Sequence, residues 1–172
     1  SSERRLLGRP PFLLTNLSCR DTLRHLRTSI MLATTSHYDA SCHCKSVRFR
    51  VTLSDGLNTA SRCSCSFCSK RGAVAVTANL GGIEFLSGRD ILTLYQFNTM
   101  TAKHYFCSKC GIYTHHQRRS DPNEYGVNVA CLEGISPFDF SQIVVNDGVN
   151  HPSDETTLPP VSGMLVFEKD VF

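Results

Sequence analysis

The chain has 172 residues, of which 41% are hydrophobic and 19% are charged, and its formal net charge is +3. This composition is typical of a globular protein rather than a disordered one, and no stretch approaches the roughly 20 apolar residues of a membrane-spanning helix. The length fits one domain with tails and is sufficient to bury a core without covalent cross-links.

The positive charge is concentrated in residues 1–37, which contain six arginines and only two acidic residues, whereas residues 38–172 sum to −1. Bulk charge therefore gives no support for a nucleic-acid partner of the body. The leader is rich in Arg, Ser and Leu and poor in acids, as organellar transit peptides are. Two other interpretations remain open. Either Met31 is the native start and the residues before it are not part of the native protein, or the segment is a flexible tail.

From Tyr38 onward the sequence predicts short strands separated by turns. Strict alternation over residues 47–51 places Val47, Phe49 and Val51 on one core-facing side. The pair Gly81-Gly82, a Ser-Gly end at 87–88 and an Asp-Pro-Asn turn bound later segments. Further strands are expected at 73–78, 83–86, 91–97, 103–106, 112–117 and 125–132. No segment carries a helical stripe longer than two turns. We therefore expect a mainly β fold, a small β-sandwich of short antiparallel strands pinned by metal sites, with little helix.

We expect three parts along the chain. Residues 1–37 form the basic leader or tail, residues 38–152 form the β domain, and residues 153–172 form a C-terminal tail. Prolines at 152, 159 and 160 predict irregular structure in this tail. Its apolar end, residues 164–167, is expected to add an edge strand or to pack on a partner subunit, as in a homodimer.

The nine cysteines carry the strongest chemical signal. Seven of them fall into three tight clusters, and Cys19 and Cys131 stand alone. A disulfide framework fits poorly, because the count is odd, no secretory signal is visible, and such closely spaced cysteines rarely act as structural cross-links. Closely spaced thiolates instead favour a soft tetrahedral cation, zinc above all, with an iron–sulfur cluster as the alternative. The clustered cysteines are Cys42, Cys44, Cys63, Cys65, Cys68, Cys107 and Cys110.

Seven ligands divide into four plus three. A four-cysteine zinc site is closed and structural, whereas three protein ligands leave a fourth position for water or substrate. One short loop supplies Cys63, Cys65 and Cys68, which makes them the natural candidates for the open, catalytic site. The closed site would then be formed by Cys42, Cys44, Cys107 and Cys110. Spacing alone does not prove this partition, and one four-cysteine zinc with spare thiols is the alternative.

The ordered motifs Cys42-x-Cys44, Cys63-x-Cys65-Ser-x-Cys68-x-Lys70 and Phe106-Cys107-x-x-Cys110-Gly111 resemble the family of glutathione-dependent formaldehyde-activating enzymes, which also includes centromere protein V. The resemblance covers roughly residues 38–151. It implies a β-rich fold with two zinc ions, divided over the same four and three cysteines. Two departures are Ala40 and Lys45, at places where the family usually has glycine; Lys45 tolerates a positive φ poorly.

The resemblance implies a zinc-dependent carbon–sulfur lyase or S-(hydroxymethyl)glutathione synthase, which acts on glutathione plus formaldehyde or on a related glutathione conjugate. The expected partners are thus a small-molecule thiol and an aldehyde or thiol conjugate, with no nucleic acid and no membrane. His104 is a candidate proton shuttle, although a structural role is the alternative. The cations Lys70, Arg71 and Arg118 are candidates to bind the glutathione carboxylates, against the alternative of solvated surface charges.

A second class of function remains open, namely a non-catalytic, zinc-stabilised structural or binding module resembling centromere protein V. Such a module would be expected to carry long basic extensions, and only the short leader is basic here. Thiolate ligands favour a reducing compartment, so we expect the protein in the cytoplasm, or in the mitochondrial matrix if residues 1–30 are a transit peptide.

Overall fold

The computed structural model describes residues 36–154 and 161–168, so the expectations for the leader lie outside the described residues. One α-helix, α2 (Ser66–Arg71), and eleven strands form the described part. The strands are β1 (His37–Ser41), β2 (Arg48–Thr52), β3 (Ser61–Cys63), β4 (Ala75–Asn79), β5 (Ile83–Ser87), β6 (Leu92–Tyr95), β7 (Lys103–Cys107), β8 (Tyr113–Gln117), β9 (Glu124–Asn128), β10 (Gln142–Asn146) and β11 (Val161–Val166). Short 3-10 turns lie at Arg89–Ile91, Val129–Cys131, Pro137–Asp139 and Pro152–Asp154.

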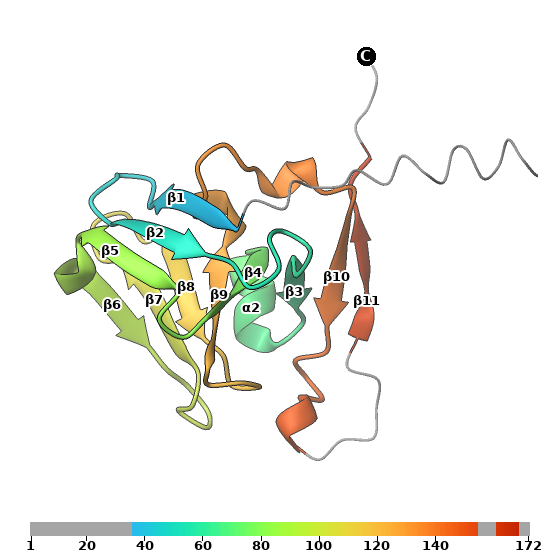
Figure 1. Ribbon diagram of the computed structural model, residues 1–172. Coiled ribbons are helices and arrows are strands. Elements are labelled where there is room, and N and C mark those ends of the chain that lie inside the picture. The colour runs from blue at the N-terminus through green and yellow to red at the C-terminus, as the bar shows by residue number, and fades with distance from the viewer. Residues whose placement is uncertain (1–35, 155–160, 169–172) are drawn as a thin grey trace, which may run out of the picture. The chain divides into compact units, whose positions relative to one another are not determined.

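The strands form two sheets, which confirms the mainly β fold with little helix. The smaller sheet has the order β1-β2-β5, and the larger has the order β11-β10-β3-β4-β9-β8-β7-β6. Every pairing is antiparallel except that of β3 with β10, which is parallel. Figure 1 shows the three-stranded sheet lying over the part of the larger sheet that contains β6 to β9.

The core lies between the two sheets. Along β2, Phe49 and Val51 are fully buried while Arg48 and Arg50 are exposed, as the alternating pattern predicts. Phe49 lies 5.9 Å from Phe85 in its own sheet and 6.4 Å from His115 on β8 of the other, measured between ring centroids. The predicted sandwich is thus held together by aromatic packing across its middle.

The prediction of a strand over residues 125–132 is confirmed for its first half and wrong for its second. β9 ends at Asn128, whose side-chain oxygen accepts a hydrogen bond from the Ala130 amide (3.1 Å) and begins the 3-10 turn Val129–Cys131. A strand would have placed Asn128 and Cys131 on opposite faces. The turn instead directs both side chains to the carbonyl oxygen of Tyr113, at 2.8 and 3.5 Å. A local side-chain cap has overridden the β propensity of this segment.

The C-terminal segment adds the expected edge strand. β11 pairs with β10, and Met164 lies opposite Val144 in the register. The sequence did not single out β10, or its parallel partner β3, although this pair supports the loop that carries the central cysteines. Over the described residues, no helix is long and apolar enough to cross a membrane.

Candidate metal centres and the adjoining cavity

The first cysteine group joins two turns. Cys42 and Cys44 lie in the turn between β1 and β2, whereas Cys107 ends β7 and Cys110 lies in the turn before β8. The four sulfurs lie within 4.8 Å of one another, with 3.6 Å between Cys42 and Cys44 and 3.8 Å between Cys44 and Cys107. Zinc–sulfur bonds of about 2.3 Å in a tetrahedron separate the sulfurs by about 3.8 Å, so this group fits a closed zinc site.

Backbone geometry shapes both turns. Gly111 has φ 73° and donates its amide to the Cys107 carbonyl (2.8 Å), and the Val47 amide points at the Cys42 sulfur (3.3 Å). Lys45 also adopts a left-handed conformation, with φ 59°. A left-handed conformation strains a lysine but not a glycine. Lys45 is the position at which the family usually has glycine.

The second group is built on the start of α2. Cys63 ends β3, Cys65 caps the helix by accepting the Cys68 amide at its sulfur (3.3 Å), and Cys68 lies one turn into the helix. The three sulfurs lie within 4.8 Å of one another. The structure therefore brings together the same four and the same three cysteines that their spacing grouped. The eight cysteines of the described ranges are free thiols.

Without a cation the three thiols of this second group share ionisation unequally. Hydrogen bonds from Cys63 and Cys68 hold the pKa of Cys65 well below its ordinary value. Hydrogen bonds with Cys63 and with Cys65 raise the pKa of Cys68, and the hydrogen bond with Cys65 raises that of Cys63. One thiolate thus suppresses the ionisation of its neighbours. Full ionisation of all three requires a bound cation, which is the property of a metal-ligand set.

Arg71, at the end of α2, links this group to His104. Its guanidinium donates to the Cys68 sulfur (3.5 Å) and to Nδ1 of His104 (3.1 Å), and it lies 3.5 Å from the centroid of the Tyr113 ring. Burial, together with the positive charge of Arg71, lowers the pKa of His104 to about 4. His104 is therefore neutral near pH 7, and because Nδ1 accepts from Arg71, its proton is on Nε2.

A cavity of about 290 Å³ adjoins the three cysteines. Its wall contains four arginines, Arg62, Arg71, Arg118 and Arg119. Three histidines, His104, His116 and His151, also line it. Of the predicted cations, Arg71 and Arg118 face this cavity, whereas Lys70 is exposed on α2 outside the lining. The histidines at 115 and 116 lie on the two faces of β8, with His115 in the core and His116 at the cavity.

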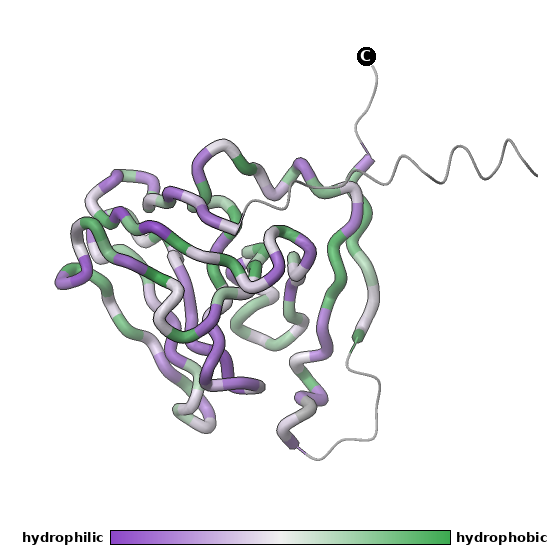
Figure 2. Tube along the Cα trace, viewed as in Figure 1, coloured by the Kyte–Doolittle hydropathy of each residue, from purple (hydrophilic) through white to green (hydrophobic). Residues whose placement is uncertain are grey.

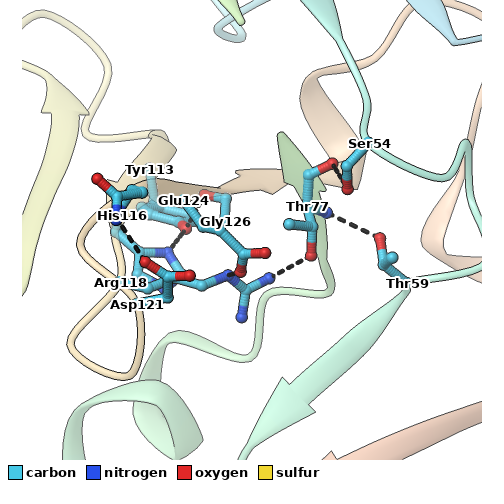
Figure 3. Close-up of polar contacts among 10 residues, drawn as sticks. Ser54, Thr59, Thr77, Tyr113, His116, Arg118, Asp121, Glu124 and Gly126 are labelled. Atoms are coloured by element: carbon cyan, nitrogen blue, oxygen red, sulfur yellow. Dashed lines mark hydrogen bonds and ion pairs between the residues drawn. The ribbon is translucent and has the colours of Figure 1, made fainter. Parts of the chain in front are cut away.

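Arg118 is fixed by neighbouring strands, as Figure 3 shows. It donates to the Thr77 hydroxyl (2.8 Å) and lies 3.4 Å from a carboxylate oxygen of Glu124. Beside it, the Tyr113 hydroxyl donates to the Gly126 carbonyl (2.9 Å) and contacts His116. Burial raises the pKa of Tyr113, so this hydroxyl keeps its proton. The polar side chains at this wall are thus held in place rather than solvated.

The segment 146–154 also reaches the cavity, and sequence reasoning missed it. The Ser64 amide donates to the Asn146 carbonyl (3.0 Å), and the Gly148 amide donates to the Ser64 hydroxyl (3.1 Å). Nδ1 of His151 accepts the Ser153 amide (3.1 Å), which leaves its proton on Nε2. No local spacing links this segment to the cysteine loop, because parallel pairing of β3 with β10 brings the two together.

Comparison with known proteins agrees with this geometry. A solved structure of a Rhodobacter sphaeroides protein is 56% identical to this chain, with a TM-score of 0.60, and the match covers 61% of this chain and 96% of that one. A family model described as glutathione-dependent formaldehyde-activating enzyme matches residues 37–143, which include all seven clustered cysteines. The match spans more than half of the chain, and the chain therefore belongs to the family of glutathione-dependent formaldehyde-activating enzymes.

Proposed function

We propose that this protein is a zinc-dependent carbon–sulfur lyase of the S-(hydroxymethyl)glutathione synthase type. It would join formaldehyde to glutathione, or catalyse the reverse cleavage of this or a related conjugate. The observation that carries the proposal is a three-cysteine group at the wall of a cavity that four arginines also line. A closed, structural metal site needs neither a missing fourth ligand nor an adjoining cationic cavity.

The three cysteines fit zinc because they supply soft, closely spaced sulfurs from one loop and one helix start. A zinc ion bound by Cys63, Cys65 and Cys68 would supply a centre at which a substrate thiol loses its proton. The Arg71 guanidinium lies against Cys68 and offsets the negative charge of the thiolates. We therefore assign Arg71 mainly to the positioning of this group and of His104.

The arginines suit an anionic substrate. Glutathione carries two carboxylates and one ammonium group, and carboxylates are well matched by guanidinium groups. Arg118 and Arg119 are held by Glu124 and Asp154, whereas no ion pair involving Arg62 is seen among the described residues. We assign carboxylate binding to Arg62, and to Arg118, already paired with Glu124, a supporting role at the same wall. Asp147, a lining acid, is the candidate for the ammonium group.

Addition of a thiolate to formaldehyde forms the carbon–sulfur bond and moves the carbonyl π electrons onto oxygen. The proton lost by the thiol returns to that oxygen, so atoms and charge balance. His104 has its Nδ1 occupied by Arg71 and is only 5% exposed, which favours a positioning role. His151 is half-buried, lines the cavity and keeps its proton on Nε2, so we assign it as the hydrogen-bond donor to the developing oxyanion.

The test combines metal content with rate. The wild-type chain is expected to hold two zinc ions and to form S-(hydroxymethyl)glutathione, followed by NMR, faster than the uncatalysed background. Cys65→Ser should hold one zinc and lose the rate enhancement, because its sulfur belongs to the open group. Cys131→Ser is the matched control, since Cys131 is a buried thiol outside both groups. Two zinc ions without any rate enhancement would favour the non-catalytic module instead.

The proposed chemistry also requires a reducing compartment, because oxidation of the three open-site thiols to disulfides would remove the ligands. We therefore retain the cytoplasm as the proposed location. Detection of the native protein in an oxidising compartment, with its cysteines paired, would contradict both the location and the mechanism.

A further inference from the structure

Strand β11 forms one edge of the larger sheet and is exposed along its whole length. Among residues 36–154 and 161–168 it pairs with β10 alone, and each of its six residues is exposed. Figure 1 shows it at the rim of the sheet, and Figure 2 shows that most of its length is hydrophobic. This strand lies beyond residue 143, where the family match ends, and its Ser162 hydroxyl contacts the Ser64 hydroxyl of the cysteine loop (3.3 Å).

The outer edge of β11 presents backbone groups that no described residue pairs with. The Phe167 amide donates to the Ser141 carbonyl at the β10 side (3.0 Å). Amide and carbonyl groups of successive strand residues point to alternate sides, so residues 163 and 165 also face β10. Met164 and Val166 therefore direct their amides and carbonyls away from the sheet, where a further strand could accept them.

This edge lacks the features that protect natural edge strands. Residues 161–167 contain no charged side chain and no proline, whereas exposed edges are commonly blocked by lysine, proline or an inward-pointing charge. Its side chains are apolar and solvent-accessible: Met164 is 54% exposed and Val166 60%. Val144 lies opposite Met164 in the register and extends the same apolar face onto β10.

We propose that β11 pairs antiparallel with β11 of a second copy of this chain, so that the two larger sheets become continuous across a two-fold axis. Antiparallel pairing of a strand with its own copy is self-complementary, as a two-fold interface requires. Because residues 161–167 are uncharged, two copies bring no like charges together.

The exposed area supports an interface of this kind. The apolar residues of this edge and the adjoining Phe138 are each between 36% and 63% exposed, and a standard interface buries about 800 Å² per partner. Phe138 is 63% exposed, and its ring centroid lies 5.3 Å from that of Phe167. Backbone pairing along the edge would add to this apolar contact. The apolar residues are Phe138, Val144, Val161, Met164, Leu165, Val166 and Phe167.

Met164→Pro tests the pairing directly. It removes an outward amide while the amides that face β10 remain, and Gly163 before it tolerates the restriction that proline imposes. The mass of the zinc-containing full chain is measured by sedimentation over a concentration series. We expect a dimer for the wild type and a dissociation constant at least about tenfold higher for Met164→Pro. Met164→Ala keeps the amide and should remain much closer to the wild type.

Circular dichroism and zinc content establish that each variant is folded. A monomeric wild type at all concentrations overturns the proposal. It is also overturned if Met164→Pro, folded and metal-loaded, dimerises as tightly as the wild type, because the dimer would then use another surface. Neither outcome depends on whether the protein acts on glutathione.

Discussion

Gly148 offers the sharpest test of the open site, because it lies directly against the cysteine loop. A Cβ placed on Gly148 would come within 2.3 Å of the Cys63 sulfur and 2.8 Å of the Cys65 backbone nitrogen. Ordinary van der Waals contacts of a Cβ begin near 3.4 Å. In Gly148→Ala the loop or the segment 146–148 must therefore shift by about 1 Å, whereas zinc sites tolerate deviations of only about 0.2 Å.

We expect Gly148→Ala to weaken zinc binding at the open site by at least about 10- to 100-fold, the range seen when a metal site loses its supporting contacts. Dialysis against a weak chelator followed by elemental analysis should leave one zinc per chain instead of two. Gly163→Ala is the matched control, because a Cβ there meets nothing within 4 Å and φ is not positive. Two tightly held zinc ions in Gly148→Ala would refute the placement of this segment against the cysteines.

Three further predictions concern stability. Lys45→Gly should stabilise the metal-loaded protein by about 1 kcal/mol in urea unfolding, because it relieves a left-handed lysine; no change would mean that the turn is unstrained. Burial lowers the pKa of His115 to about 4, so the neutral side chain contributes fully to the free energy of unfolding above pH 6.5. This contribution falls as the pH drops toward 4, by about 3 kcal/mol. His115→Phe should therefore lose less stability than the wild type between pH 7 and 5, and equal losses would exclude His115 as the cause. Gly88→Ala should destabilise the protein far more than Gly81→Ala, by on the order of 3 against 1 kcal/mol. Both glycines have a positive φ, but only at Gly88 would the added Cβ clash with backbone, at 2.1 Å from the Ser46 carbonyl oxygen. Similar melting temperatures of the two variants would contradict this.

The sequence was most informative where the chemistry is local. Thiols two or three residues apart must lie close together, so the members of each cluster could be predicted without a fold. The alternation around Phe49 likewise predicted which side chains β2 buries, because a strand has a period of two. The end of β9 could not be predicted in this way, since one side-chain cap at Asn128 decided it.

The parts of the site that were missed depend on contacts between distant segments. His151 and Gly148 reach the cavity because β10 lies parallel to β3, and a parallel pair leaves no turn signal in the sequence. Arg62 was missed for a similar reason, because nothing in the neighbouring sequence distinguishes an arginine that lines a cavity from one exposed to solvent. Predicting these residues requires the topology first, which spacing and propensity do not supply.

The closed cysteine group has a consequence for how the chain finds its fold. Cys44 and Cys107 are 63 residues apart; Cys44 lies in a turn of the small sheet, between β1 and β2, and Cys107 ends β7 of the large sheet. A metal ion that holds both acts as a cross-link, and closing a loop of that length removes unfolded-state entropy worth about 4 kcal/mol. With such a metal bound, the small sheet would pack onto the large one by a short-range step instead of a slow, long-range search. Assembly of the sandwich would then follow the supply of metal to the newly made chain, before any substrate is present.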